Sequence, residues 1–166
     1  MPFVIEALSA AHNRLAFSCG VEALDRYLQT QAGQDMRRRV ANCFVACPTG
    51  TTTIAAYYTL AASSLAVTDM AVEELRRLPR YPVLPAALIG RIAVDRQYTG
   101  RSLGAATIAD AITRALRAEP AVFALVVDAK DERAAAFYKH FGFAAFASRP
   151  MSFYLPMATA AKLGPR

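Results

Sequence analysis

The chain has 166 residues, of which 55% are hydrophobic, and it carries a formal net charge of +6 at pH 7. This length fits a single domain, 1–166, with a substantial core, and the apolar content excludes an intrinsically disordered chain. No apolar stretch is long enough to span a bilayer and no secretory signal opens the sequence, so we expect a cytoplasmic protein without a membrane segment. The basic excess fits a polyanionic partner, but it also fits a merely soluble surface, and charge alone does not separate the two.

The first half of the chain alternates strand and helix patterns. Val21, Leu24 and Leu28 recur at helical spacing, and Pro48-Thr49-Gly50 is a turn signal between two apolar, β-rich runs. The predicted elements are an edge strand over 3–8, a helix over 21–32, a hairpin of strands 41–47 and 53–62, and a surface helix over 69–78.

The second half begins with an extended connector that holds Pro79, Pro82 and Pro85. The predicted elements that follow are a central strand over 86–95, a glycine loop over 96–104, a helix from Ala105 to Arg117, a strand over 121–127, a helix over 131–141 and strands over 143–147 and 151–155. Asp131 fits the N-cap of the last helix, and Gly142 fits its C′ position. This mixed order predicts the α+β class, with a central, partly parallel sheet.

The three cysteines, Cys19, Cys43 and Cys47, have no second ligand cluster nearby, and the chain has only two histidines. We therefore expect reduced, buried thiols and no metal site.

The junction between the central strand and the next helix holds Gly100 and Gly104. Glycines let successive backbone N–H groups turn inward, and the helix adds the positive end of its dipole, so the junction suits a diphosphate. Gln97 and Arg101 can add side-chain donors. The spacing fits neither a Walker loop nor a dinucleotide fingerprint, and a plain loop without a ligand stays open as an alternative.

The stretch Arg96-Gln97-Tyr98-Thr99-Gly100-Arg101-Ser102 resembles motif A of the GNAT acetyltransferases, Gln/Arg-x-x-Gly-x-Gly/Ala. Ser102 stands where that family usually has glycine or alanine. The resemblance implies the GNAT fold and acetyl-CoA as co-substrate, with its pantetheine arm paired to the central strand like an added strand. The cofactor-binding residues that it implies are Ile92, Ala93, Val94, Gln97, Thr99, Gly100, Arg101, Ser102, Leu103, Gly104, Ala105 and Phe137.

A second signature is Phe137-Tyr138-Lys139-His140-Phe141-Gly142-Phe143, which resembles the GNAT helix that ends beneath the CoA tail. The tyrosine of that motif commonly stands near the thioester sulfur, so we assign Tyr138 as the general acid that protonates the departing thiolate. The alternative is an aromatic core cluster, since Phe137 and Phe141 share one helix face.

Three further stretches narrow the resemblance. They are similar to the acetyltransferase toxins of bacterial toxin–antitoxin pairs. The stretches are Phe17-x-Cys19-Gly20-Val21-x-x-Leu24-x-x-Tyr27-Leu28, Tyr57-Tyr58-Thr59-Leu60 and the run from Leu88 to Asp95. The resemblance implies acetylation of the α-amino group of aminoacyl-tRNA, which blocks translation. It also implies a ribbon-helix-helix antitoxin as partner and, by family precedent, a homodimer. The candidate tRNA-binding residues are Arg37, Arg38, Arg39, Arg76, Arg77, Arg80 and Arg91.

Two other functions stay open at this point. One is a GNAT enzyme that acetylates a small amine or a protein N-terminus, although the basic chain disfavours an acidic pocket for cationic amines. The other is a non-catalytic module that binds CoA or nucleic acid, against which Tyr138 and the intact loop both argue.

Overall fold

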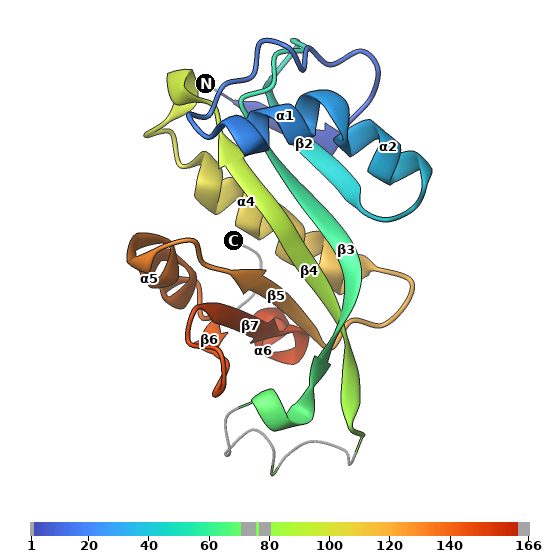
Figure 1. Ribbon diagram of the computed structural model, residues 1–166, viewed down its shortest axis with the longest axis vertical. Helices are drawn as coiled ribbons and strands as arrows, with labels where there is room; N and C mark the ends of the chain where they lie inside the picture. Colours follow the sequence, from blue (N-terminus) through green and yellow to red (C-terminus); the bar gives the residue numbers. More distant parts are fainter. Residues whose placement is uncertain (1, 71–75, 77–80, 163–166) are drawn as a thin grey trace. The chain divides into compact units, whose positions relative to one another are not determined.

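The structure is a computed structural model that describes residues 2–70, 76 and 81–162 (Figure 1). In chain order the elements are β1 (Phe3–Ala7), α1 (Glu22–Thr30), α2 (Ala32–Arg37), β2 (Asn42–Pro48), β3 (Ala56–Ala66), η1 (Val67–Asp69), β4 (Val83–Val94), η2 (Arg96–Tyr98), α4 (Leu103–Arg117), β5 (Ala124–Asp128), α5 (Glu132–His140), β6 (Ala144–Ala145), β7 (Ser152–Pro156) and α6 (Met157–Lys162). Among the described residues, no helix combines the length and the apolar character that a membrane span requires.

The strands form a seven-stranded sheet in the hydrogen-bonded order β1-β2-β3-β4-β5-β7-β6. β4 and β5 pair in parallel, with Ala86 opposite Ala124. The pairs β1–β2, β2–β3, β5–β7 and β6–β7 are antiparallel. The predicted α+β class with a partly parallel sheet is therefore confirmed.

The chain divides into two compact units. Unit 1 comprises Met1–Ala61 and Gly90–Ala111, and unit 2 comprises Ala62–Ile89 and Ile112–Arg166. β3 and β4 contribute residues to both units, and each unit has a core of its own.

The core of unit 1 lies against β2, whose residues from Cys43 to Pro48 are all buried. Such a continuous apolar run is expected of a strand that is covered on both faces. From one side α1 contributes Tyr27 and Leu28, and Phe17 and Tyr57 meet edge to face with ring centroids 5.4 Å apart.

The core of unit 2 is built on β5 and β7. Their buried side chains form one cluster with Leu84 and Ala86 of β4. Phe146 and Tyr154 pack in this cluster with ring centroids 4.8 Å apart. α5 begins and ends as the sequence predicts. The Asp131 carboxylate accepts the Ala134 N–H at 2.8 Å, and Gly142 has φ +97°.

The helix predicted over 21–32 is wrong in its extent, because α1 ends at Thr30 and α2 begins at Ala32. Gln31, with φ −117° and ψ −34°, separates α1 from α2. Gly33 lowers the helix propensity of α2. Ala32 is nonetheless fully buried.

Other boundaries also differ. β4 starts at Val83 and includes Pro85, which was expected in a connector; proline lacks only the N–H, and the Pro85 carbonyl accepts a bond from the Phe123 N–H at 2.9 Å. β3 starts at Ala56, and Thr53 forms only an isolated bridge. The helix predicted over 69–78 lies largely outside the described residues, and α6 was not predicted from the sequence.

Candidate functional site

The glycine loop connects β4 to α4 in unit 1, as predicted. Gly100 has φ +78°, and a Cβ added there would have no heavy atom within 4 Å. A bound anion needs such room next to a left-handed glycine, because its oxygens must approach the backbone closely.

Ser102 also adopts the left-handed conformation, with φ +60°. It stands at the position where the related motif usually has glycine or alanine, and the positive φ gives a physical reason for glycine there. Its carbonyl accepts the Ala106 N–H at 3.0 Å and so starts α4, while its side chain is exposed.

α4 directs its N-terminus at this loop. Leu103 is buried against Ala46, Ala55 and Ala56, which fixes the first turn of the helix to the core of unit 1. The backbone N–H groups of that turn are therefore held in place, and the helix dipole favours an anion there.

The remaining predicted loop residues take different positions. Gln97 and Arg101 are exposed, and the Arg101 guanidinium lies 5.4 Å from the centre of the Tyr98 ring. The Thr99 hydroxyl donates to the Arg96 carbonyl at 3.2 Å, so its proton is directed into the loop. Of the strand residues, Ala93 is buried, whereas Ile92 and Val94 are half-buried.

Tyr138 lies in unit 2, on α5, with 4% of its surface exposed. Its ring packs on Phe143 and Phe153, with centroids 5.8 Å and 6.3 Å away. No described residue hydrogen-bonds its hydroxyl. Since no buried polar side-chain atom in the described part of the chain lacks a partner, this hydroxyl must be open to solvent although its ring is buried.

The pKa of Tyr138 is raised to about 12, first by burial and then by the nearby carboxylates of Asp128 and Asp131. The phenol is therefore protonated throughout the neutral range, which a general acid requires.

The predicted packing of Phe137 against Phe141 is confirmed, with ring centroids 5.1 Å apart. The Phe137 ring also meets the Tyr138 ring edge to face at 5.6 Å, so the aromatic cluster and the candidate acid adjoin each other.

The predicted arginines of unit 1 lie at its surface. Arg37, Arg38 and Arg39 are exposed around the end of α2, and Arg39 has φ +61°. Arg91 is exposed on β4, and its guanidinium lies 3.6 Å from the centre of the Tyr27 ring. Stacking of this kind holds the cation flat and leaves its N–H edge open. In unit 2 Arg76 is exposed, whereas Arg77 and Arg80 lie outside the described residues.

Arg14 belongs with these arginines and was missed from the sequence. A Cβ on Gly33 would lie 3.0 Å from Nη1 of Arg14 and 3.3 Å from Nη1 of Arg37, so the two guanidinium groups flank one glycine. Nothing in the sequence around Arg14 marks it as a neighbour of α2. Arg14, Arg37, Arg38 and Arg91 are called the basic face below.

Asp35 lies beside this face and makes no ion pair with its arginines. The Tyr27 hydroxyl donates to Oδ2 of Asp35 at 2.7 Å, and the Gln31 amide donates to Oδ1 at 3.0 Å. These bonds, with the charges of Arg91 and Arg38, lower the pKa of Asp35. Arg14, Arg37 and Arg91 have no ion pair with any acid among the described residues, and crowded cations of this kind suit phosphate oxygens.

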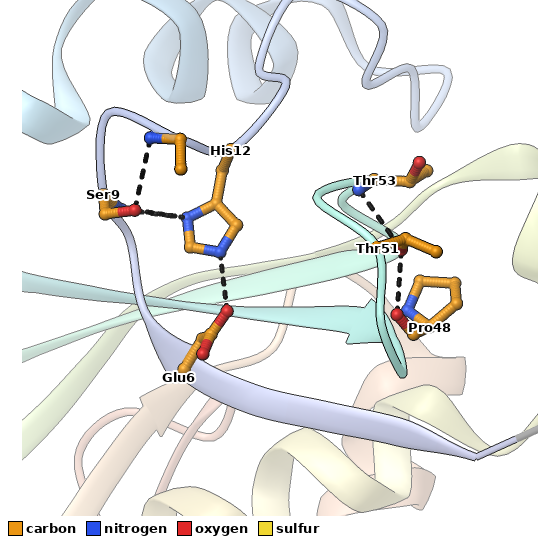
Figure 2. A network of polar contacts seen from close by, with 7 residues as sticks. Glu6, Ser9, His12, Pro48, Thr51 and Thr53 are labelled. Carbon is orange, nitrogen blue, oxygen red and sulfur yellow. Dashed lines mark hydrogen bonds and ion pairs between the residues drawn. The ribbon is translucent and has the colours of Figure 1, made fainter.

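Potential metal-ligand atoms of Glu6, His12 and Cys47 lie within 4.8 Å of one another (Figure 2 shows Glu6 and His12). The Ser9 N–H donates to Nδ1 of His12 at 2.9 Å, which places the ring proton on Nε2, and Nε2 bonds Glu6 at 2.9 Å. A ligating histidine normally donates its second N–H outward. Burial raises the pKa of the Cys47 thiol to about 11. The hydrogen bonding thus favours a structural network over a metal site.

Comparison with known proteins defines the family. The profile of the acetyltransferase (GNAT) family matches residues 14–143. The "tRNA-acetylating toxin" of Mycobacterium tuberculosis (strain ATCC 25618 / H37Rv) is 35% identical over 158 residues, which cover 94% of this chain and 93% of that protein. The chain therefore belongs to the GNAT acetyltransferase family, and it is an N-acetyltransferase that uses acetyl-CoA.

Solved structures of high similarity include AtaT complexed with acetyl-methionyl-tRNAfMet, with a TM-score of 0.90, 26% identity and coverage of 98% of this chain and 99% of that one. A mutant AtaT toxin bound to the C-terminus of the antitoxin AtaR and to acetyl-CoA has a TM-score of 0.82 and 25% identity, with 99% of each chain covered.

Proposed function

We propose that this acetyltransferase is a toxin that acetylates the α-amino group of aminoacyl-tRNA and so blocks translation. The observation that carries the proposal is similarity along almost the whole chain to the tRNA-acetylating toxin of M. tuberculosis. In an acetylated α-amino group the nitrogen lone pair is delocalised into the amide carbonyl, so the nitrogen no longer attacks in peptide bond formation. Because the enzyme turns over, a small amount of it would stop protein synthesis.

The proposed acetyl-CoA site is the glycine loop with the first turn of α4. Backbone N–H groups from Gly100 to Ala105 bind the diphosphate, and Gln97 and Arg101 add donors at its edge. In unit 1 the β4 backbone from Ile92 to Val94 is assigned to pair with the pantetheine arm, and the resemblance to the second GNAT motif assigns Phe137 of unit 2 as a further CoA contact. The open space at Gly100 and the anchoring of Leu103 support this assignment.

Tyr138 is the proposed catalytic residue. The acceptor amine needs no strong base, because an α-amino group has a pKa of about 7.7–8.0 and the ester of aminoacyl-tRNA lowers it further. The thiolate that leaves must gain a proton, and the Tyr138 hydroxyl, protonated and free of partners among the described residues, holds one. A backbone N–H near Val94 polarises the thioester carbonyl.

The basic face is the proposed contact for tRNA phosphates. It adds Arg14 to the predicted Arg37, Arg38 and Arg91. Arg39 in unit 1 and Arg76 in unit 2 are further exposed candidates. Such contacts supply affinity that is independent of base sequence and that weakens with salt.

The proposed partners are a ribbon-helix-helix antitoxin and a second copy of the chain, within the cytoplasm where aminoacyl-tRNA is used. The bound antitoxin in the AtaT structure supports the first. Residues 1–166 are proposed to act as a single catalytic domain.

A different acceptor, such as a small amine or a protein N-terminus, is the alternative. The unpaired arginines of the basic face disfavour it, because a cationic amine would be repelled there. A non-catalytic binding module is disfavoured by family membership and by the open hydroxyl of Tyr138.

The test is incubation of the protein with labelled acetyl-CoA and charged total tRNA, beside uncharged tRNA and free amino acids. Label should appear on charged tRNA alone and should stay on the amino acid after the ester is hydrolysed. Turnover of acetyl-CoA with free amines but not with charged tRNA would refute the proposal and support the alternative acceptor.

A further inference from the structure

The segment Phe17–Gly20, called the strap below, belongs to the toxin-like pattern in the sequence, yet the proposed reaction gives it no role. It is held firmly within unit 1. Phe17 is 3% exposed and packs on Tyr57, and the Cys19 N–H donates to Oδ1 of Asp25 at 2.9 Å. Gly20 has φ +93°, a conformation that favours glycine.

Asp95 joins this strap to the glycine loop. Oδ2 of Asp95 accepts the Ser18 N–H at 2.9 Å, while Oδ1 accepts the Gln97 N–H at 2.8 Å and caps η2. The Asp95 N–H donates to the Ala55 carbonyl at 2.8 Å, and Asp95 is only 6% exposed. A buried carboxylate that accepts two N–H bonds is a strong and directional tie.

Arg96 completes the connection. Its N–H donates to the Ser18 carbonyl at 2.9 Å, and its Nη2 donates to Oγ of Ser18 at 2.6 Å. The N–H, the carbonyl and the hydroxyl of Ser18 are thus all bonded to Asp95 and Arg96, the two residues at which the chain leaves β4. The strap, which lies near the N-terminus, thus holds the start of the glycine loop in place.

We propose that Asp95 and Ser18 are positioning residues for acetyl-CoA. They touch neither the diphosphate nor the reacting atoms. By tying the start of the loop to the strap, they hold the N–H groups from Gly100 to Ala105 in the arrangement that the diphosphate needs. A loop that is ordered before binding avoids the entropy cost of becoming ordered on binding. The hydrogen bonds between the strap and the loop should therefore raise the affinity for acetyl-CoA. The inference rests on the proposed phosphate site.

Asp95→Asn tests it with almost no change in volume. The amide keeps one acceptor and turns the other position into a donor, which then faces an N–H. We expect the Kd of acetyl-CoA, measured by calorimetry, to rise about tenfold, and the KM for acetyl-CoA to rise with it. The kcat at saturating acetyl-CoA should stay near the wild-type value. Hydrogen exchange at residues 100–105 should be faster in the free variant and return to the wild-type rate when acetyl-CoA saturates it.

Asp25→Asn is the matched control. It alters the same kind of carboxylate bond to the strap, one residue further on, but Asp25 bonds Cys19 and makes no bond to the loop. Its Kd for acetyl-CoA should match that of the wild type. Equal weakening in the two variants would mean a general loosening of unit 1 and would overturn the proposal.

Ser18→Ala removes only the bond from Arg96 Nη2 and should weaken acetyl-CoA binding about threefold. If Asp95→Asn does not fold, this variant decides, and an unchanged Kd overturns the proposal. Wild-type affinity in a folded Asp95→Asn overturns it as well. A wild-type protein that fails to bind acetyl-CoA would refute the proposed phosphate site itself. That result is distinct from an unchanged Kd in either variant.

Discussion

Tyr138 shows how one side chain can combine a structural and a chemical role. Its ring is part of the aromatic packing of α5 on β7, whereas its hydroxyl has no partner among the described residues. Removing the hydroxyl should therefore change the chemistry and leave the packing.

Tyr138→Phe should lower kcat on charged tRNA by about 10²–10⁴-fold, the usual contribution of general acid catalysis. Melting temperature and acetyl-CoA affinity should stay close to wild type, because the ring remains. Turnover assays and a calorimetric titration measure the two effects. Activity within a few-fold of wild type would remove Tyr138 from the mechanism, and loss of acetyl-CoA binding would make it a cofactor contact.

The raised pKa of Tyr138 predicts a pH profile. The contribution of the neutral Tyr138 phenol to the free energy of unfolding is fully present below pH 10.0, the ordinary pKa of tyrosine. It is lost only as pH rises through the pKa of about 12 in the folded protein. Wild-type kcat should therefore not decline between about pH 7 and pH 10 through ionisation of the acid. A decline centred near pH 8 that is absent from Tyr138→Phe would contradict the raised value.

The left-handed backbone conformation of Ser102 is strained, because Ser102 has a Cβ and glycine does not. Ser102→Gly should leave the free energy of unfolding unchanged or raise it by up to about 1 kcal/mol, because glycine adopts a left-handed φ without a steric penalty. Ser102→Val should lower it, because a branched Cβ tolerates that conformation least. Chemical denaturation compares the three proteins, and a glycine variant less stable than the valine variant would contradict the assigned backbone.

At the scale of elements, α2, β4 and the chain around Arg14 together form the basic face. Their proximity is seen only in the structure, where the guanidinium groups of Arg14 and Arg37 both lie beside Gly33.

Arg37→Glu and Arg14→Glu should each raise the KM for charged tRNA and reduce the salt slope of binding by about 1, with unchanged affinity for acetyl-CoA. Arg26→Glu is the matched control, since Arg26 is exposed on α1 and pairs with Glu22 instead. Filter binding at several salt concentrations gives the slopes. The same loss in the control would show that only net charge matters.

At the scale of the whole molecule, bound acetyl-CoA should stabilise the native state, by about 2.7 kcal/mol at a concentration 100 times Kd. Gly100→Glu should abolish this stabilisation, since the carboxylate would occupy the phosphate space and repel the ligand. Melting curves with and without acetyl-CoA measure it.

Gly50→Glu provides the control for that experiment. Gly50 has φ +81° and open space around it, much as Gly100 does, but it lies in the turn after β2. The variant therefore introduces the same charge and a similar backbone strain. It should keep the full acetyl-CoA stabilisation, and if both variants lost it, the loop would not be the binding site.

The sequence by itself determined what depends on near neighbours. The hairpin turn, the caps of α5 at Asp131 and Gly142, and the junction of strand, glycine loop and helix all follow from residues a few positions apart, and the structure confirms them. Local hydrogen bonds and backbone preferences fix such features before the chain is packed.

Tertiary structure alone decided what depends on distant residues. The bond from Ser18 to Asp95 joins positions 77 apart in sequence, and the guanidinium of Arg14 lies beside Gly33 of α2. The break at Gln31, the strand conformation of Pro85 and the left-handed Ser102 were likewise not predicted from the local pattern. A pattern read along the chain carries no information on which distant groups meet, because burial of the core brings them together only when the whole chain folds.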